Sequence, residues 1–331
     1  MDLDAFVLTK RESWQRLETL AKQRNLSGAE ADELMNRYQH ATTDLSVIRS
    51  TAPESSVSIR LSGIIARTRT KFTGTPGGAF AGIGRFFVVS FPVALYRLRW
   101  LTLGIGLAFV LIAALTAAWV ANNPEVQQAL APEAALKAIA EHDFVAYYSE
   151  NPASSFAAGV WTNNAWIAAQ WIALGITGVF VIYGLISNAV NVGIMAGILF
   201  AFDYGTTFFT YILPHGIPEL TSIFIAAAAG LRIFWAWVVP GPRTRVRALA
   251  EEGRSLFTVA LGLVLVLFLS GLVEAYVTPS SLPVPVRIGI GVIFFIALWT
   301  YAIALGRRAA RDGETGDLER QDAGDERASV G

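Results

Sequence analysis

The residues best suited to chemistry in the apolar part of this chain are His215 and Glu219, four positions apart among two prolines and a glycine. An imidazole and a carboxylate at this spacing could hold a cation, share a proton or hydrogen-bond a partner. Pro218 fits the first turn of a helix, where its missing N–H would be unpaired anyway, and Glu219 suits the positive end of that helix. We therefore predict a break within residues 213–220, where a new membrane-spanning helix starts. The turn leaves open whether the two side chains share a face, and a structural helix start without function is the alternative.

Three further polar residues are expected beside this pair: Glu274, Asn163 and Asn164. In the topology derived below, the helices that carry these residues, His215 and Glu219 begin or end at the same outer surface of the membrane. The five side chains then need only adjacent helices to converge. The sequence therefore predicts one polar cluster at the outer leaflet, which could share a proton, hold a cation or bind a partner's segment. The alternative is a set of helix caps that lock three helices together.

A single histidine beside a glutamate does not make a zinc hydrolase motif. The usual helical motif has paired histidines, and a zinc protease needs a third ligand and a general base. The chain has only two other histidines, His40 and His142, and no cysteine. We therefore predict no catalytic residue, no metal and no cofactor.

A second pair of ionisable residues falls inside the predicted membrane-spanning helices. At 1.5 Å per residue, Asp203 lies roughly 16 Å and Arg232 roughly 10 Å from the inner boundary of the membrane. An unpaired charge at such depth is costly, and the long Arg side chain can bridge the difference in depth. We therefore predict an intramembrane ion pair between Asp203 and Arg232, with separate solvation of the two charges as the alternative.

Composition determines the class of protein. Hydrophobic residues make up 53% of the 331 residues, charged residues only 16%, and the mean hydropathy is +0.47. These values are too apolar for a soluble globule of this length, so we predict an all-α, polytopic membrane protein. The formal net charge of zero gives no indication of nucleic-acid binding. No signal peptide is predicted, because about ninety mostly polar residues precede the first long apolar run.

Basic residues set the predicted topology through the positive-inside rule. Arginines gather at 97–99, 243–247 and 307–311, whereas residues 122–154 contain one lysine and five carboxylates. All the basic segments face the cytoplasm only if the region 155–213 crosses the membrane twice, with a turn near Asn188 and Asn191. We therefore predict six spans, both termini in the cytoplasm and an outer loop at 122–154. The spans are expected at about 100–120, 166–186, 192–212, 219–239, 256–276 and 286–305.

The chain divides into three predicted regions. Residues 1–75 have the charge density and apolar period of a cytoplasmic three-helix head, with Ser27 as the N-cap of its second helix. Residues 76–306 form the transmembrane domain. Within it, 80–92 is expected as an interfacial entry helix and 126–139 as an amphipathic helix in the outer loop. The mixed-charge tail at 307–331 is expected to be disordered.

Several motifs together give the chain a family resemblance. They are Asn163-Asn164, Asn191-x-Gly193, His215-Gly216-Ile217-Pro218-Glu219-Leu220, the run Ala226-Ala227-Ala228-Ala229-Gly230, Glu274-x-x-x-Thr278-Pro279 and, in the head, Trp14-x-x-Leu17 and Tyr38 with Asp44-Leu45. The sequence resembles the stage II sporulation protein M family, in the longer actinobacterial form with a helical head. The resemblance implies a membrane anchor that recruits peptidoglycan-degrading partners. Relatives of the longer form are often encoded beside MoxR-type AAA ATPases.

Three functional classes follow from these observations. The first is a non-catalytic membrane scaffold that binds cell-envelope partners, either peptidoglycan hydrolases or a MoxR-type AAA ATPase. The second is a transporter or permease subunit with a polar site at the outer leaflet. The third is an intramembrane metal-dependent hydrolase. The expected setting is the plasma membrane of a bacterium, so membrane lipid is a partner, nucleic acid is not, and a second copy of the chain is a further candidate.

Overall fold

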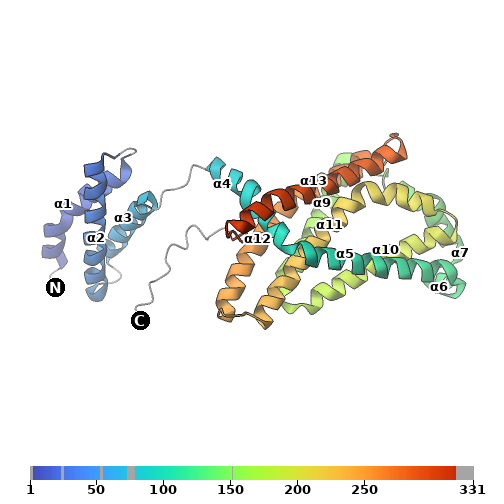
Figure 1. Ribbon diagram of the computed structural model, residues 1–331, viewed down its shortest axis with the longest axis horizontal. Helices are drawn as coiled ribbons and strands as arrows, with labels where there is room; N and C mark the ends of the chain where they lie inside the picture. Colours follow the sequence, from blue (N-terminus) through green and yellow to red (C-terminus); the bar gives the residue numbers. More distant parts are fainter. Residues whose placement is uncertain (1–2, 24–25, 53–54, 73–78, 151, 318–331) are drawn as a thin grey trace. The chain divides into compact units, whose positions relative to one another are not determined.

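The computed structural model describes residues 3–23, 26–52, 55–72, 79–150 and 152–317 (Figure 1). Over these residues it contains helices and turns but no strand, so the predicted all-α class is confirmed. Contacts divide the chain into two compact units, Met1–Ile83 and Gly84–Gly331. We call them the head and the membrane unit. The predicted boundary between residues 75 and 76 lies outside the described residues.

Three helices form the head: α1 (Leu3–Lys22), α2 (Gly28–Thr51) and α3 (Ser56–Phe72). Leucines and isoleucines at helical spacing fill its core, among them Leu17, Leu34, Ile48 and Leu61, each at most 1% exposed. Ser27 forms the predicted cap, because its hydroxyl accepts from the Glu30 backbone N–H while the Glu30 side chain accepts from the Ser27 backbone. The head therefore has a hydrophobic core of its own.

Long helices make up the membrane unit. Its elements are α4 (Ala79–Arg85, which crosses the division between the units), η1 (Phe86–Ser90), α5 (Phe91–Asn122), α6 (Pro124–Leu130), α7 (Glu133–Ala138), η2 (Ile139–Asp143), α8 (Phe144–Ala146), α9 (Ala153–Ala173), η3 (Gly175–Thr177), α10 (Val179–Ala201), α11 (Gly205–Val238), α12 (Arg245–Leu272), η4 (Val273–Val277) and α13 (Val284–Arg311). Five helices in the described residues are long and apolar enough to cross a membrane: those containing α5, α10, α11, α12 and α13. Six spans were predicted, and the 21-residue α9, which overlaps the second of them, is not among these five helices.

The second and third predicted spans have wrong boundaries. The chain reverses at Gly178, which has a φ of +62°, and not near Asn188 and Asn191, which lie inside α10. Glycine tolerates this left-handed conformation because it has no Cβ. Asn188 instead donates from its side-chain amide to the carbonyl of Gly184, one turn earlier, at 2.9 Å. Asn188 therefore belongs to a continuous apolar helix and does not mark a turn.

The predicted break within residues 213–220 is also wrong, because α11 runs through both Pro214 and Pro218. Pro218 removes the hydrogen bond that the Pro214 carbonyl would accept in a regular helix. Gly291 of α13 approaches that carbonyl closely, and Ser270 of α12 donates from its hydroxyl to the His215 carbonyl at 3.2 Å. Packing against neighbouring helices lets a membrane helix keep its prolines, so one long helix stands where two were predicted.

Three smaller predictions about the entry helix, the loop helix and the tail are also wrong. The stretch 80–92 is not a separate interfacial helix, because the π turn η1 joins α4 to α5, with Pro92 in the first turn of α5. The predicted loop helix at 126–139 is divided into α6 and α7 by Pro132. Residues 307–317 of the predicted disordered tail are ordered, and Thr315 accepts from Arg97 at 2.6 Å. Residues 318–331 lie outside the described residues.

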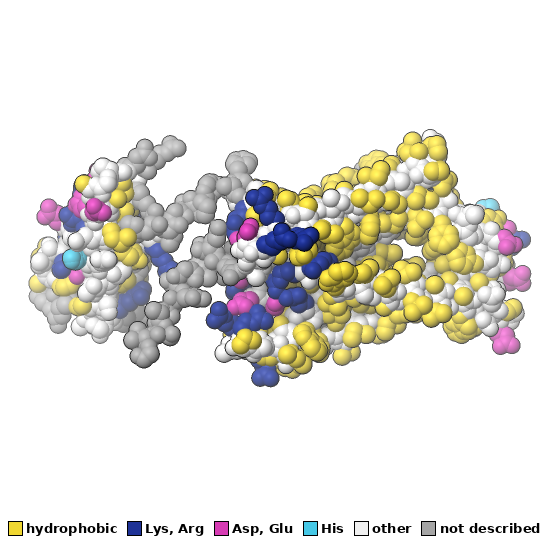
Figure 2. Space-filling model, viewed as in Figure 1, with side chains coloured by type: hydrophobic (Ala, Val, Ile, Leu, Met, Phe, Trp, Pro, Cys, Tyr) yellow, Lys and Arg dark blue, Asp and Glu magenta, His cyan; other side chains and the backbone are white. Residues whose placement is uncertain are grey.

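Charged side chains are segregated along the membrane unit. On the face shown in Figure 2, Lys and Arg gather mostly at one end, where some Asp and Glu lie among them, whereas Asp and Glu predominate at the opposite end. The helices between these ends carry a wide apolar surface. This distribution is the one expected of a bundle that lies across a bilayer.

Candidate functional site

Three ionisable side chains meet inside the membrane unit, and we call His215, Glu219 and Glu274 the acid–histidine cluster. His215 and Glu219 lie one turn apart on α11, which stays helical through its prolines, so they share a face. Glu274 comes from the π turn η4, which continues α12. One possible ligand atom from each of the three residues lies within 4.8 Å of the other two. The structure therefore brings together residues that are up to 59 positions apart.

The imidazole of His215 has a polar neighbour at each ring nitrogen. Its Nδ1 lies 3.1 Å from the hydroxyl oxygen of Thr278, and its Nε2 lies 3.8 Å from Oε1 of Glu274. The side chains of His215 and Glu274 are each only 6% exposed. The Thr278 contact fixes the ring so that Nε2 faces the carboxylates.

Glu219 completes the cluster from the next turn of α11. Its carboxyl group lies beside the side chains of Asn164 and Glu274. The second oxygen of Glu219, Oε2, is buried and has no hydrogen-bond partner within the described part of the chain. A buried polar atom without a partner calls for an explanation.

The structure separates the two asparagines that the sequence placed together. Asn164 is partly buried and contacts Glu219, whereas Asn163 is exposed on α9. Consecutive helical residues point in directions about 100° apart, so both cannot face one cluster. The cluster also lies well inside α11, with Glu219 fourteen residues after Gly205. Its placement at the outer leaflet stays a prediction.

Sequence reasoning missed three residues around the cluster: Thr278, Arg287 and Tyr148. Arg287 is 8% exposed and donates from Nη1 to the Thr278 carbonyl at 2.5 Å. It is the only basic residue between Arg254 and Arg307, and this isolation inside an apolar segment was a usable signal. The ring centroid of Tyr148 lies 5.7 Å from that of His215. Burial, followed by the charge of Glu274, raises the pKa of Tyr148, so its hydroxyl stays protonated.

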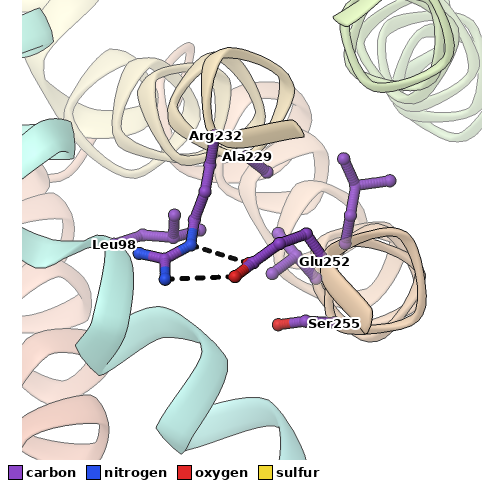
Figure 3. A pocket seen from close by; sticks show the side chains of 7 residues that line it. Leu98, Ala229, Arg232, Glu252 and Ser255 are labelled. Atoms are coloured by element: carbon purple, nitrogen blue, oxygen red, sulfur yellow. Dashed lines mark hydrogen bonds and ion pairs between the residues drawn. The ribbon is translucent and has the colours of Figure 1, made fainter. Parts of the chain in front are cut away.

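The predicted ion pair between Asp203 and Arg232 is wrong. Asp203 is exposed in the turn before α11, with a φ of +65°, while Arg232 lies near the other end of that helix. Arg232 instead pairs with Glu252 of α12, whose Oε2 lies 2.7 Å from the Arg232 Nε (Figure 3). Arg97 of α5 also contacts Glu252, at 3.1 Å. The predicted turn at residues 188–191 placed Asp203 deep inside a membrane span. Because the turn is at Gly178 instead, this depth is wrong, and so is the pairing of Asp203 with Arg232.

Comparisons with known proteins find a family match in each of the two units. The family model described as stage II sporulation protein M matches residues 106–279, a segment that contains the whole acid–histidine cluster. A second model, described as a domain of unknown function (DUF8413), matches residues 4–74 of the head. An archaeal protein of Methanocaldococcus jannaschii, described as uncharacterized, is 29% identical over 122 residues, which cover 36% of this chain and 68% of the relative. No solved structure matches the chain.

Proposed function

This chain belongs to the stage II sporulation protein M family, and from that premise we propose that it is a non-catalytic membrane scaffold whose head binds a protein partner. The observation that carries the proposal is the division into two compact units, each with a hydrophobic core of its own. A folded module joined to a bundle of membrane helices suits a protein that holds a partner at the membrane. We place it in the plasma membrane of a bacterium, with both termini cytoplasmic.

The head has a polar cleft that fits this role. The cleft has a volume of about 500 Å³ and is lined by Ser13, Asp32, Glu33, Asn36, Arg37 and His40. Arg37 and Arg16 both pair with Glu33, at 2.8 and 2.9 Å, so the charged groups beside the cleft are held in place. Ordered charged groups favour a specific protein contact over a loose one. A cytoplasmic head would meet a MoxR-type AAA ATPase, whereas peptidoglycan hydrolases would meet the outer loops.

Site-specific photo-crosslinking in cells tests this scaffold role. A photoreactive residue at Asn36, in the cleft, should yield a covalent adduct that mass spectrometry identifies as a MoxR-type AAA ATPase. The same residue at Ile59, which is 69% exposed on α3, serves as the matched control on the head surface. Adducts to that ATPase from both positions, or from neither, would count against the cleft as its binding surface.

The acid–histidine cluster gives a second candidate function, a transporter or permease subunit. Ionisable residues inside membrane helices commonly mark the route of a proton or an ion. In that case, protein reconstituted in liposomes should carry protons or cations down an imposed gradient, and Glu219→Gln should stop the flux. Absence of flux from folded, correctly inserted protein would remove this candidate and leave the scaffold.

A further inference from the structure

We propose that His215, Glu219 and Glu274 bind a divalent transition-metal cation, for which Zn²⁺ and Mn²⁺ are the best-fitting ions. The site would lie inside the membrane unit, between α9, α11 and η4. One imidazole nitrogen and two carboxylate oxygens form a mixed donor set, which suits these ions better than the soft cations that select thiolates. Three protein ligands also leave room for a water molecule or a second ligand on the ion.

The separations within the cluster suit one shared ion. Zinc binds imidazole nitrogen and carboxylate oxygen at about 2.0 to 2.2 Å, so two ligands on one ion are separated by at most about 4.4 Å. The three candidate ligand atoms already lie within 4.8 Å of one another. Small side-chain rotations would therefore bring all three into the coordination sphere.

The surroundings of each ligand resemble the support that metal sites require. A metal-binding histidine usually engages its other ring nitrogen in a hydrogen bond, which fixes the ring and its tautomer. Here Thr278 contacts Nδ1 of His215 and leaves Nε2 directed at Glu274. The buried Oε2 of Glu219 has no partner within the described residues, and a cation would supply one.

Charge balance favours a divalent ion over a single shared proton. Two ionised carboxylates inside a membrane bundle carry two negative charges, which a divalent cation would neutralise. The buried guanidinium of Arg287 donates to the Thr278 carbonyl. One proton shared by Glu219 and Glu274 would balance one charge and leave Oε2 of Glu219 without a partner. The competing model is therefore a protonated carboxyl pair without metal.

Metal analysis of the purified full-length protein in detergent tests the site directly and does not depend on the scaffold role. After incubation with Zn²⁺ or Mn²⁺ and removal of free metal, elemental analysis should find about one ion per chain. His215→Gln and Glu274→Gln should reduce the bound fraction more than tenfold. Thr278→Val should weaken affinity by roughly 10- to 100-fold, as is usual when a group supporting a ligand is lost. His142→Gln is the matched control, because it removes an exposed imidazole outside the cluster.

A spectroscopic measurement on the wild-type protein keeps the proposal testable if a variant fails to fold. Co²⁺ added to the metal-free protein should give visible absorption bands of a nitrogen- and oxygen-ligated ion, and Zn²⁺ should displace them. Wild-type protein that retains no metal and gives no such bands would overturn the site and favour the protonated pair. Equal metal binding by wild type and a folded His215→Gln variant would also overturn it.

Discussion

At the scale of single residues, the membrane unit contains two separate groups of buried ionisable side chains. Glu252 pairs with Arg97 and Arg232, from three different helices, while His215, Glu219 and Glu274 meet near Thr278. The first group is an ion-pair network with one carboxylate and two guanidinium groups. The second has two carboxyl groups and a histidine, so a proton or a cation must complete it.

The ion-pair network predicts unequal effects for two carboxylate substitutions. Glu252→Gln removes the only carboxylate that pairs with Arg232 in the described residues, and its side chain is 7% exposed. Because the Arg232 side chain is 37% exposed, loss of its partner should cost about 1 to 3 kcal/mol, less than for a fully buried pair. Asp203→Asn changes an exposed turn residue whose left-handed backbone Asn also tolerates, so its effect should stay within about 0.5 kcal/mol.

Thermal unfolding in detergent measures both substitutions. If Arg232 and Glu252 interact directly, the double change to Arg232→Gln and Glu252→Gln should destabilise less than the sum of the single changes. Additive losses would contradict the pairing. An Asp203→Asn loss as large as that of Glu252→Gln would contradict the placement of Asp203 in an exposed turn.

Glu33 predicts an acid dependence of the head. Hydrogen bonds from Arg16 and Arg37 lower the pKa of Glu33 to about 2, from a usual value near 4.5. A carboxylate with a lowered folded-state pKa contributes stability above its unfolded pKa and loses it as pH falls toward the folded value. Glu33→Gln should therefore lower the Tm of a fragment of residues 1–72 at pH 7, and the difference should vanish as pH approaches 2. The fluorescence of Trp14 reports the unfolding, Glu12→Gln on α1 is the control, and a constant difference across this range would contradict the prediction.

At the scale of secondary-structure elements, the close packing of helices in the membrane unit depends on glycines. Gly193 and Gly197 have the four-residue spacing that allows close helix contact, and both lie against α5. A Cβ at Gly193 would lie 2.6 Å from the Ala113 carbonyl oxygen, and one at Gly197 would lie 2.6 Å from the Val120 Cβ. The α5–α10 pair therefore depends on the absence of side chains at these positions.

Two glycine-to-alanine substitutions should have opposite effects. Gly193→Ala places a methyl group against the Ala113 carbonyl of α5, which cannot move freely. Overpacking of this kind lowers the free energy of unfolding by about 1 to 3 kcal/mol. Gly104→Ala introduces the same group inside α5 where nothing lies within 4 Å. It should stabilise the helix by roughly 0.5 to 1 kcal/mol. Unfolding temperatures in one detergent would compare them, and equal stability would show that α5 and α10 do not pack as described.

The whole molecule combines a head and a membrane unit whose long helices alternate in direction along the chain. If α9 crosses the membrane in addition to the five helices that are long and apolar enough to do so, we predict six passages, with the turns at Gly178 and at 239–244 on the same side as the arginines at 97–99. The short helices α6, α7 and α8 then face the opposite side. This assignment changes the boundaries of the spans but keeps their predicted number, which is even and leaves both termini on one side of the membrane.

Cysteine labelling tests this topology, because the chain contains no cysteine of its own. Single cysteines at Gln128 in α6 and at Arg245 at the start of α12 are both exposed in the membrane unit. In intact cells, a membrane-impermeant thiol reagent should modify Gln128→Cys, and should modify Arg245→Cys only after permeabilisation. Labelling of Arg245→Cys in intact cells would refute the orientation, and labelling of both would refute the number of crossings.

The sequence alone determined the class of this protein and most of its helical content. Mean hydropathy and long apolar runs predicted an all-α membrane protein, and apolar periodicity predicted the three-helix head with its cap at Ser27. The motifs predicted the family that the match over residues 106–279 shows. These properties follow from local composition and spacing, which do not depend on how distant segments pack.

Only the tertiary structure decided where helices turn and which polar residues meet. The sequence suggests a turn at Asn188 and a helix start at Pro218, yet both lie inside long helices. The Asn188 amide donates to the Gly184 carbonyl, and α11 continues through Pro218 while packed against α12 and α13. The partner of Arg232 is on α12, one helix later than predicted. Glu219 and Glu274 meet because α11 and η4 pack together, and Thr278 and Arg287 join them there. Such contacts depend on the rotation and depth of packed helices, which a one-dimensional pattern of hydropathy does not specify.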